Sequence, residues 1–496
     1  MSRSGQQVAL VGAGITGLCT ALALSRKGFC VDLFERDIPP PAGNADAAFF
    51  SWNRRGAAQF RHPHAFLGLM CNLLKDRYPD LLDEFFEAGA RQVTFDQMVP
   101  PNLGAQYRPE PGDEKLWVLL CRRATMETVL RRYVERQPGI QIVNKTYVTG
   151  VKTESRPRGL TVTGLELTDR EKDNRKSVYR ADIYVDATGR ASKFRQWLET
   201  AGATITEEKE NAEIVYYTRH YQLKSGVEEP DRHSEDPATG DVGYMKYGVF
   251  PGEGGHFALI VCLPTGEHRL REAVKDPEKF DAICLKIPGL VPWISKDRAD
   301  PTTPSFGIGD IQAVWRSFLN NDQPQIRNFF SVGDAFARTN PLYGRGCSTG
   351  ILHAHILADA LSEFQDPDQR AVEFERMTRG QIRPIYDASL NEDRNGKRRA
   401  EAIMNNTTLD QADSLKKWFG LAFGDALLAA SRREIDVFRG IMRTVNLVEK
   451  PGAFLKAPKI RRTIFRYMLR GRKKNSQARV QRGPTRDQML DYIAEL

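Results

Sequence analysis

The chain has 496 residues, of which 27% are charged and 41% hydrophobic, as in an ordinary soluble globular protein. This length exceeds what one compact core accommodates, so we expect two or three domains. No apolar stretch is long enough to cross a bilayer and the N-terminus does not resemble a signal peptide, so we expect a cytoplasmic protein. Seven cysteines without a CxxC pair or metal-type spacing predict reduced thiols, with no disulfide framework and no metal site.

The net charge of +9 is concentrated near the C-terminus. Residues 451–486 contain twelve Lys or Arg and no acid, which leaves −3 (9 − 12) for the rest of the chain. Apolar residues recur there at helical spacing, namely Ile460, Ile464, Phe465 and Met468. A basic amphipathic helix suits peripheral contact with an anionic membrane surface; the alternative is a helix packed on the body, with solvated arginines. Few aromatic residues accompany these charges, so we expect no nucleic-acid binding.

Residues 8–35 have the pattern of a strand, a glycine turn, a helix and a second strand that ends in an acid. Gly12 permits the tight turn, Gly14 lets the backbone approach a pyrophosphate, and Gly17 lets the helix pack closely on the strand. The helix N-terminus then faces the phosphates, and Glu35 offers a carboxylate to a ribose diol. The pattern predicts a dinucleotide site rather than an ordinary tight turn.

Further along the chain, the expected elements alternate between buried strands and an antiparallel region. A strand is predicted at about Ile140–Val143, followed by two hairpin-like strands and an apolar strand that ends at Asp186. Alternating apolar and polar residues over 205–305 predict an antiparallel sheet with long connections. A long helix is expected from about Gly346 to Glu363, and the chain is predominantly helical from Glu375 onward.

Two later segments point to the same chemistry as the glycine turn. The small residues of Asp186-Ala-Thr-Gly189 would let a strand end pass close to a cofactor. Asp334, at another expected strand end, suits hydrogen bonding to a polyol chain. The loop 341–346 opens a helix whose N-terminus can stabilise negative charge on a reduced ring system.

In their order, these segments resemble the FAD-dependent monooxygenase superfamily with the para-hydroxybenzoate hydroxylase fold. The motifs are the glycine turn, Arg122-Arg123-Ala-Thr-Met-Glu127, Asp186-Ala-Thr-Gly189, Gly333-Asp334, Asn340-Pro341 and Gly344-Arg-Gly346. Within the superfamily the chain is most similar to bacterial oxidoreductases that include polyether epoxidases, which share segments like 55–64 and 483–490. Ala58 departs from these relatives, which commonly have proline there.

The resemblance implies FAD, with its adenosine end on the glycine turn, Glu35 and Arg123, and with Asp334 at the ribityl–pyrophosphate region. The segment 341–346 is expected beside the isoalloxazine. The full set of residues expected to bind FAD is Gly12, Gly14, Ile15, Thr16, Gly17, Glu35, Arg36, Arg55, Arg123, Val148, Ala187, Gly189, Gly333, Asp334, Pro341, Gly344, Arg345 and Gly346.

The expected fold class is α/β, with a Rossmann-type FAD-binding domain interleaved with an antiparallel-sheet substrate domain and followed by a helical C-terminal region. The expected boundaries are 1–80, 106–200 and 306–375 for the discontinuous FAD-binding domain, 81–105 and 201–305 for the substrate-binding domain, and 376–496 for the helical region with its basic tail.

The implied activity is that of an FAD-dependent oxidoreductase, a monooxygenase of secondary metabolism. It would insert one oxygen atom of O₂ into a hydrophobic, electron-rich small molecule by epoxidation or hydroxylation, through a flavin C4a-(hydro)peroxide. No second GxGxxG motif is present, so electrons would come from NAD(P)H directly or through a separate flavin reductase as partner. The alternatives are an FAD-dependent reductase or dehydrogenase of an isoprenoid or lipid, and a non-catalytic flavin-binding protein. The sequence does not display the lysine and tryptophan signature expected of a flavin halogenase.

This chemistry requires no side-chain nucleophile, so catalytic residues stay unassigned and only candidates are named. His62 and His64 lie two apart in a motif-like segment, but a third metal ligand is not nearby. Tyr217 and Arg219 share one face of a predicted strand, which either lines the substrate cavity or packs in the core. His353 and His355 are expected to pack rather than to form a site.

Overall fold

The computed structural model describes residues 5–57, 59–157, 159–169, 174–480 and 482–496, so Ala58 lies outside the described residues. At its centre is a five-stranded sheet in the order β21-β9-β1-β2-β5, in which all neighbouring strands are parallel. The strands are β1 (Gln7–Val11), β2 (Cys30–Phe34), β5 (Ile140–Val143), β9 (Ile183–Asp186) and β21 (Phe329–Ser331). All five therefore end at one edge of the sheet.

Both faces of this sheet are covered, which is why β1 is an unbroken apolar run. Val8 and Leu10 pack on one side among helices, and Ala9 and Val11 pack on the other side against a β-meander. The helices are α1 (Ile15–Arg26), α3 (Gly68–Arg77), α4 (Pro79–Glu87), α7 (Arg123–Glu135) and α12 (Gly346–Glu363). The meander consists of β6 (Thr146–Arg156), β7 (Gly159–Asp169) and β8 (Arg175–Tyr179), with β20 (Ile326–Arg327) beside β7.

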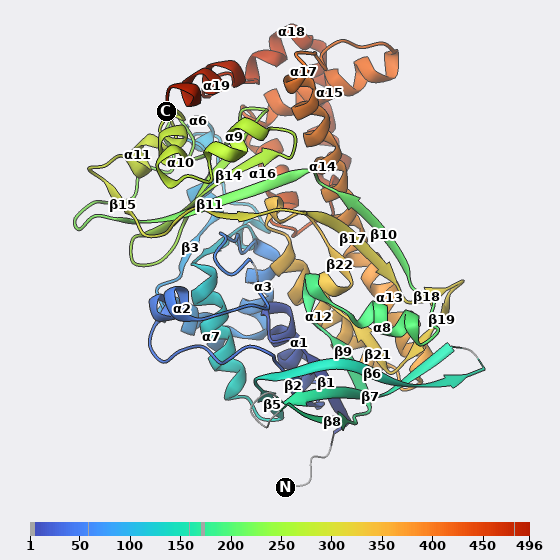
Figure 1. Ribbon diagram of the computed structural model, residues 1–496. Helices are drawn as coiled ribbons and strands as arrows, with labels where there is room; N and C mark the ends of the chain where they lie inside the picture. The colour runs from blue at the N-terminus through green and yellow to red at the C-terminus, as the bar shows by residue number, and fades with distance from the viewer. Residues whose placement is uncertain (1–4, 58, 158, 170–173, 481) are drawn as a thin grey trace.

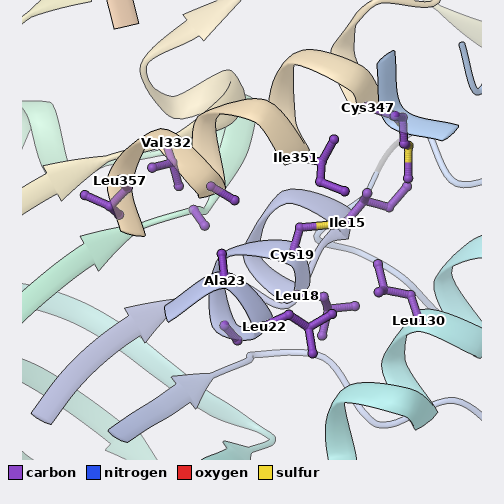
Figure 2. Packing of buried hydrophobic residues seen from close by; sticks show 14 of the residues in the cluster. Ile15, Leu18, Cys19, Leu22, Ala23, Leu130, Val332, Cys347, Ile351 and Leu357 are labelled. Carbon is purple, nitrogen blue, oxygen red and sulfur yellow. The ribbon is translucent and has the colours of Figure 1, made fainter. Parts of the chain in front are cut away.

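Helix α1 is central to the first core. Figure 2 shows its side chains Ile15 and Cys19 directed toward Cys347 and Ile351 of α12, while Leu130 of α7 lies on its other side. The two helices that begin at the sheet edge, α1 and α12, therefore pack directly on each other.

A second, six-stranded sheet lies above the first domain in Figure 1. It consists of β12 (Thr239–Asp241), β13 (Lys246–Pro251), β14 (His256–Pro264), β11 (Ile214–Leu223), β15 (Ala299–Pro301) and β16 (Phe306–Ile308). One of its faces is covered by α9 (His268–Ala273), α10 (Pro277–Cys284), α11 (Val291–Ile294) and α19 (Arg486–Glu495). The remaining strands pair in smaller sheets: β10 (Thr206–Asn211) with β17 (Gln312–Ser317) and β22 (Ala337–Arg338), β3 (Arg91–Val93) with β4 (Val118–Leu120), and β18 (Leu319–Asn320) with β19 (Gln323–Pro324).

Helices dominate the rest. The shorter ones are α2 (Ala45–Ser51), α5 (Phe95–Met98), α6 (Pro101–Gly104) and α8 (Phe194–Thr200), and the C-terminal ones are α13 (Pro367–Gln381), α14 (Arg383–Met404), α15 (Leu415–Ser431), α16 (Ile435–Val445), α17 (Pro458–Leu469) and α18 (Arg472–Asn475). The expected α/β fold class is confirmed, and α12 has the bounds expected for the long helix.

Two details differ from expectation or refine it. In α17, Phe465 is 61% exposed, whereas Tyr467 joins Ile460 and Ile464 in the buried face, because residues 460, 464 and 467 share one helical side and residue 465 does not. The domain boundaries stay a prediction. Helix α4, in the segment 81–105, packs in the first core, and α19 packs with the second sheet.

Candidate functional site

The carboxyl edge of the parallel sheet gathers the expected motifs. Val11 lies opposite both Phe34 and Asp186, and Asp186 lies opposite Ser331. The residues that follow these strands are the glycine turn, Glu35, Ala187 and Gly333, so they meet at one edge. In open α/β sheets this is where ligands bind.

The glycine turn is closed at two positions and open at a third. Gly12 has φ +100°, and a Cβ there would lie 2.7 Å from the Ala187 carbonyl oxygen. A Cβ at Gly17 would overlap the carbonyl oxygen of Gly12. A Cβ at Gly14 would meet no atom within 4 Å, and no side chain caps α1 at this residue. The N-terminus of α1 therefore has space beside Gly14, where a diphosphate could approach its first N–H groups.

Helix α12 begins in the same way. No side chain of its N-cap residue, Arg345, caps it, and a Cβ at Gly346 would meet no atom within 4 Å. Thr16 of α1 contacts α12 at Gly350 and the strand end at Gly333 so closely that neither glycine has room for a Cβ. Two uncapped helix N-termini are thus held side by side.

Asp334, in the 3-10 turn Gly333–Ala335, offers a free acceptor beside these helices. Its carboxylate is partly buried and makes no hydrogen bond to the part of the chain that the structure describes. Burial raises the pKa of Asp334, and the charges of Arg338, Arg123 and Arg190 act against that rise. A partly buried carboxylate without a donor suits the hydroxyl groups of a bound polyol.

Glu35 lies in a buried ion cluster that sequence reasoning only partly identified. Its carboxylate accepts hydrogen bonds from the backbone N–H groups of Ala13 (2.8 Å) and Asp37 (2.9 Å). The guanidinium of Arg54 lies 3.4 Å from Glu35, 3.3 Å from Asp37 and 3.0 Å from Glu127. Arg54 also donates to the Ala13 carbonyl, so it ties the glycine turn to α7.

The sequence offers both Arg54 and Arg55 as contacts to the flavin or its phosphates or as a solvated loop, and the expected set contains Arg55, whereas the structure buries Arg54. The side chain of Arg55 is exposed, and its carbonyl oxygen accepts a hydrogen bond from Arg36. In the sequence the two arginines are adjacent in one loop, and nothing local to them distinguishes the buried one.

The other expected cationic residues are held by protein partners. Arg123 pairs with Glu127 at 2.6 Å and contacts the Nε2 atom of His64. Arg345 binds the hydroxyl of Ser389 and the carboxylate of Glu392 on α14, so its side chain points to that helix. The guanidinium of Arg345 is therefore held by α14.

The remaining expected residues come from elements at or next to this edge. Ile15 and Thr16 form the first turn of α1, and Val148 lies on β6, two residues after Thr146. Gly189 follows β9, and a Cβ built on it would lie 3.9 Å from the Cβ atom of Asp334. The Thr146 N–H binds the Glu35 carbonyl. Pro341 and Gly344 bound the short turn before α12, with Gly344 at φ +65°.

One face of β11 lies over the segment that carries His62. Thr218 shares a hydrogen bond of 2.9 Å with the Nδ1 atom of His62, and His220 binds the Arg61 carbonyl through Nε2 at 2.8 Å. The hydroxyl of Tyr216 donates to the Asn340 side chain, which begins the turn before α12. The strand therefore joins the second sheet to both loops at the site.

Burial lowers the pKa of His62 to about 4, with a further contribution from the charge of Arg123, and burial lowers the pKa of His220 to about 4. The pKa of His64 is also well below its ordinary value, mainly because of burial. At neutral pH these three imidazoles are uncharged, so they offer hydrogen bonds without a cation.

The candidates Tyr217 and Arg219 lie on the opposite face of β11, because neighbouring residues of a strand alternate between faces. Tyr217 packs in the core beneath α10, and Arg219 pairs with Asp281 of α10 at 2.6 Å. The structure therefore does not bring this pair to the sheet edge. The residues of β11 that do contact the site loops, Thr218 and His220, were not expected.

Other polar candidates have structural partners. His353 accepts from the Gly333 N–H and stacks on Phe374, as expected of a packing residue. All seven cysteines are free and buried. Across the described ranges, no cluster of three or more His, Cys, Asp or Glu could hold a metal ion.

The chain is similar to several known proteins. A family model described as an NAD(P)-binding Rossmann-like domain matches residues 10–79. The chain is 25% identical to Protein Rv3254 of Mycobacterium tuberculosis over 398 residues, 76% of this chain and 78% of that protein. The structure is similar to the flavin-dependent brominase Bmp2 (TM-score 0.60, 15% identity, 94% of this chain and 100% of that chain). It is also similar to PqsL, a probable FAD-dependent monooxygenase from Pseudomonas aeruginosa (TM-score 0.55, 15% identity, 81% and 100%).

The chain has the fold of para-hydroxybenzoate hydroxylase-like flavin monooxygenases. The expected resemblance is confirmed at this level, and the nearer likeness to polyether epoxidases stays a prediction. No helix of the described chain combines the length and the apolar character needed to span a bilayer.

Proposed function

We propose that the chain is an FAD-dependent monooxygenase that oxygenates a hydrophobic, electron-rich small molecule. The observation that carries the proposal is the pair of uncapped N-termini of α1 and α12, with open space at Gly14 and Gly346 and an unpartnered Asp334 beside them. The first helix N-terminus suits the diphosphate of a dinucleotide, and the second suits negative charge on a reduced isoalloxazine ring. The flavoproteins named above, which share the fold, support the choice of FAD.

In this proposal each part of the cofactor has its own residues. The first turn of α1 binds the diphosphate, Glu35 binds the ribose hydroxyls, and Asp334 binds the ribityl hydroxyls. The N-terminus of α12 stabilises negative charge on the reduced ring through its free N–H groups. When bound, FAD would supply the two-electron chemistry that activates O₂.

The protein itself contributes position and exclusion of water. The second sheet is bonded to the loops of the site through Tyr216, Thr218 and His220. It therefore lies over the carboxyl edge of the parallel sheet. The imidazoles beneath it are neutral at pH 7, so they do not draw in counter-ions or water. Neutral imidazoles on this side of the site favour an apolar substrate, and exclusion of water there would slow unproductive reactions.

The test begins with purified protein loaded with FAD and reduced anaerobically by NADPH, by NADH or by dithionite. The reduced protein is mixed with ¹⁸O₂ and a panel of phenols and alkenes, and products are analysed by mass spectrometry. We expect one ¹⁸O atom in a product. Reduction by NAD(P)H itself would indicate a self-sufficient enzyme, and reduction only by dithionite would indicate a separate reductase.

Other outcomes would contradict the proposal. Turnover of an isoprenoid or lipid without O₂ would identify a reductase or dehydrogenase. Bound FAD that no donor reduces would identify a non-catalytic flavoprotein. Because Bmp2 is a brominase, the panel is repeated with bromide, and a brominated product in place of an oxygenated one would also contradict the assignment.

A further inference from the structure

The helices α15, α17 and α18 form a separate cluster at the end of the molecule away from the parallel sheet, at the top of Figure 1. Their packing core includes Ala426, Ala429, Ile464 and Tyr467. We refer to the exposed side of this cluster, between residues 415 and 474, as the α15–α18 surface. It takes no part in the proposed site.

The apolar stripe of α15 continues past the helices that cover it. Leu415, Trp418, Phe419, Ala422, Ala426 and Ala429 share one helical side. The alanines toward the C-terminal end are buried, whereas Leu415 is 79% exposed, Phe419 is 55% exposed and Trp418 is 43% exposed. The solvent-facing side of a helix normally carries polar residues, so the apolar side chains at the N-terminal half of α15 are unusual for an exposed surface.

Helix α17 exposes a second apolar pair. Phe465 and Leu469, one turn apart, are more than half exposed, and Arg461 precedes them on the same stripe. Four of the five exposed Phe and Trp residues of the described chain lie on α15 or α17, namely Trp418, Phe419, Phe423 and Phe465; the fifth is Phe50. Such clustering marks an interaction surface rather than scattered surface residues.

The same segment carries the positive charge of the protein. Residues 405–480 contain seventeen Lys or Arg and six Asp or Glu, a net charge of +11, so the rest of the chain has −2 (9 − 11). Each of the six acids pairs with a basic residue of this segment. Several exposed cations have no acidic partner in the described chain, namely Lys416, Arg461, Arg462, Arg470, Lys473 and Lys474. Seven of the seventeen cations of this segment form ion pairs within the described chain, for example Arg472 and Arg479 with Asp425.

We propose that the α15–α18 surface binds the face of a bilayer that contains anionic phospholipids, with the aromatic residues of α15 and α17 inserted among the acyl chains. The surface unites the two components that interfacial binding needs, exposed aromatic and leucine side chains and unpaired cations around them. A protein partner would have to match both features on two neighbouring helices, whereas a membrane supplies them without shape complementarity. This proposal is independent of the cofactor and of the reaction.

The test measures binding of the full-length protein to vesicles of phosphatidylcholine with and without phosphatidylglycerol, by flotation, at low and high salt. We expect binding only to the anionic vesicles, weaker at high salt, with a blue shift of tryptophan fluorescence that Trp418→Phe removes. Replacing both Trp418 and Phe419 by Ala should weaken binding about tenfold or more. Replacing Arg461, Arg462, Lys473 and Lys474 by Ala should weaken it about a hundredfold or more.

The matched control replaces Arg175, Lys176 and Val178 by Ala, since these are exposed cationic and apolar residues on β8, outside the surface. This variant should bind as the wild type does, and thermal unfolding checks that every variant is folded. Absence of binding to anionic vesicles would overturn the proposal, as would binding that neither set of substitutions weakens. A dimer in sedimentation that the Trp418 and Phe419 substitutions dissociate, without vesicle binding, would assign the surface to a second copy instead.

Discussion

The carboxyl edge of the parallel sheet and the strand β11 above it treat their polar groups in opposite ways. At the edge, the first N–H groups of α1 and α12 and the carboxylate of Asp334 have no side-chain partner among the residues that the structure describes. On β11, a polar side chain of each face is bonded within the protein, Thr218 to His62 and Arg219 to Asp281. Polar groups without protein partners suit a site where a ligand completes their hydrogen bonds. Glu35 differs from them, since it already accepts hydrogen bonds from two backbone N–H groups. Substitutions at four places test this contrast.

The largest effect should come from the closed part of the glycine turn. Gly17→Ala places a Cβ against the Gly12 carbonyl oxygen, so the turn must move, and we expect a loss of about 3 kcal/mol or more in the free energy of unfolding. FAD binding should be lost with it. Gly14→Ala is the matched control, because its Cβ meets no protein atom: it should keep the stability and weaken FAD binding only. Chemical denaturation and FAD titration measure both, and equal destabilisation by the two substitutions would contradict this view of the edge.

The buried ion cluster should give the next largest effect. Arg54→Ala leaves the carboxylates of Glu35 and Asp37 buried without this cation, and Glu127 keeps only Arg123, so we expect about 3 kcal/mol of destabilisation. Arg55→Ala, at an exposed neighbour, should change the unfolding free energy by less than about 0.5 kcal/mol. If urea denaturation showed a larger effect for Arg55→Ala than for Arg54→Ala, Arg55 rather than Arg54 would be the buried arginine of this loop.

Asp334 should affect the cofactor more than the fold. Because burial raises its pKa, the folded protein binds more protons than the unfolded one between the two pKa values, so this residue makes the FAD-free protein less stable as the pH rises through that range. Asp334→Asn should remove that component of the pH dependence and weaken FAD binding about tenfold. Thermal unfolding across pH measures the first effect and titration the second. An unchanged pH profile together with unchanged FAD affinity would contradict the role of Asp334 as the free acceptor.

The smallest effect should distinguish the two faces of β11. Thr218→Val removes the hydroxyl that bonds His62 and should cost about 1 kcal/mol of stability and shift the NMR signals of the His62 ring. Tyr217→Phe, on the other face, should leave those signals in place. If Tyr217→Phe moved them and Thr218→Val did not, the assignment of faces would be wrong.

The sequence was sufficient to predict the edge because its requirements are local. A positive φ at Gly12 and close packing at Gly17 demand glycine whatever the rest of the fold does, and the helix at Gly346–Glu363 follows from its own pattern. These features depend on residues close together in the sequence, so they can be predicted without knowing which distant segments pack against them.

The contacts that β11 makes with the site could not be predicted in this way. The alternation in β11 shows that two faces exist, but not which one turns toward the sheet edge, so it does not distinguish Tyr217 and Arg219 from Thr218 and His220. The same limit applies to Arg54 and Arg55, since the partners that bury Arg54 come from β2 and α7, far apart in the sequence. Tertiary contacts, not local pattern, decide these positions.

The most direct test of the central claim is an equilibrium titration of the cofactor-free protein with FAD and, separately, with NADH, followed by flavin fluorescence and calorimetry. We expect one FAD to bind per chain, and we expect Gly14→Val and Asp334→Asn to weaken that binding. NADH should bind much more weakly, because it lacks the ribityl chain proposed to bind Asp334 and the isoalloxazine ring proposed to lie at α12. Tight binding of NADH with no binding of FAD would contradict this claim and would make the edge a nicotinamide site.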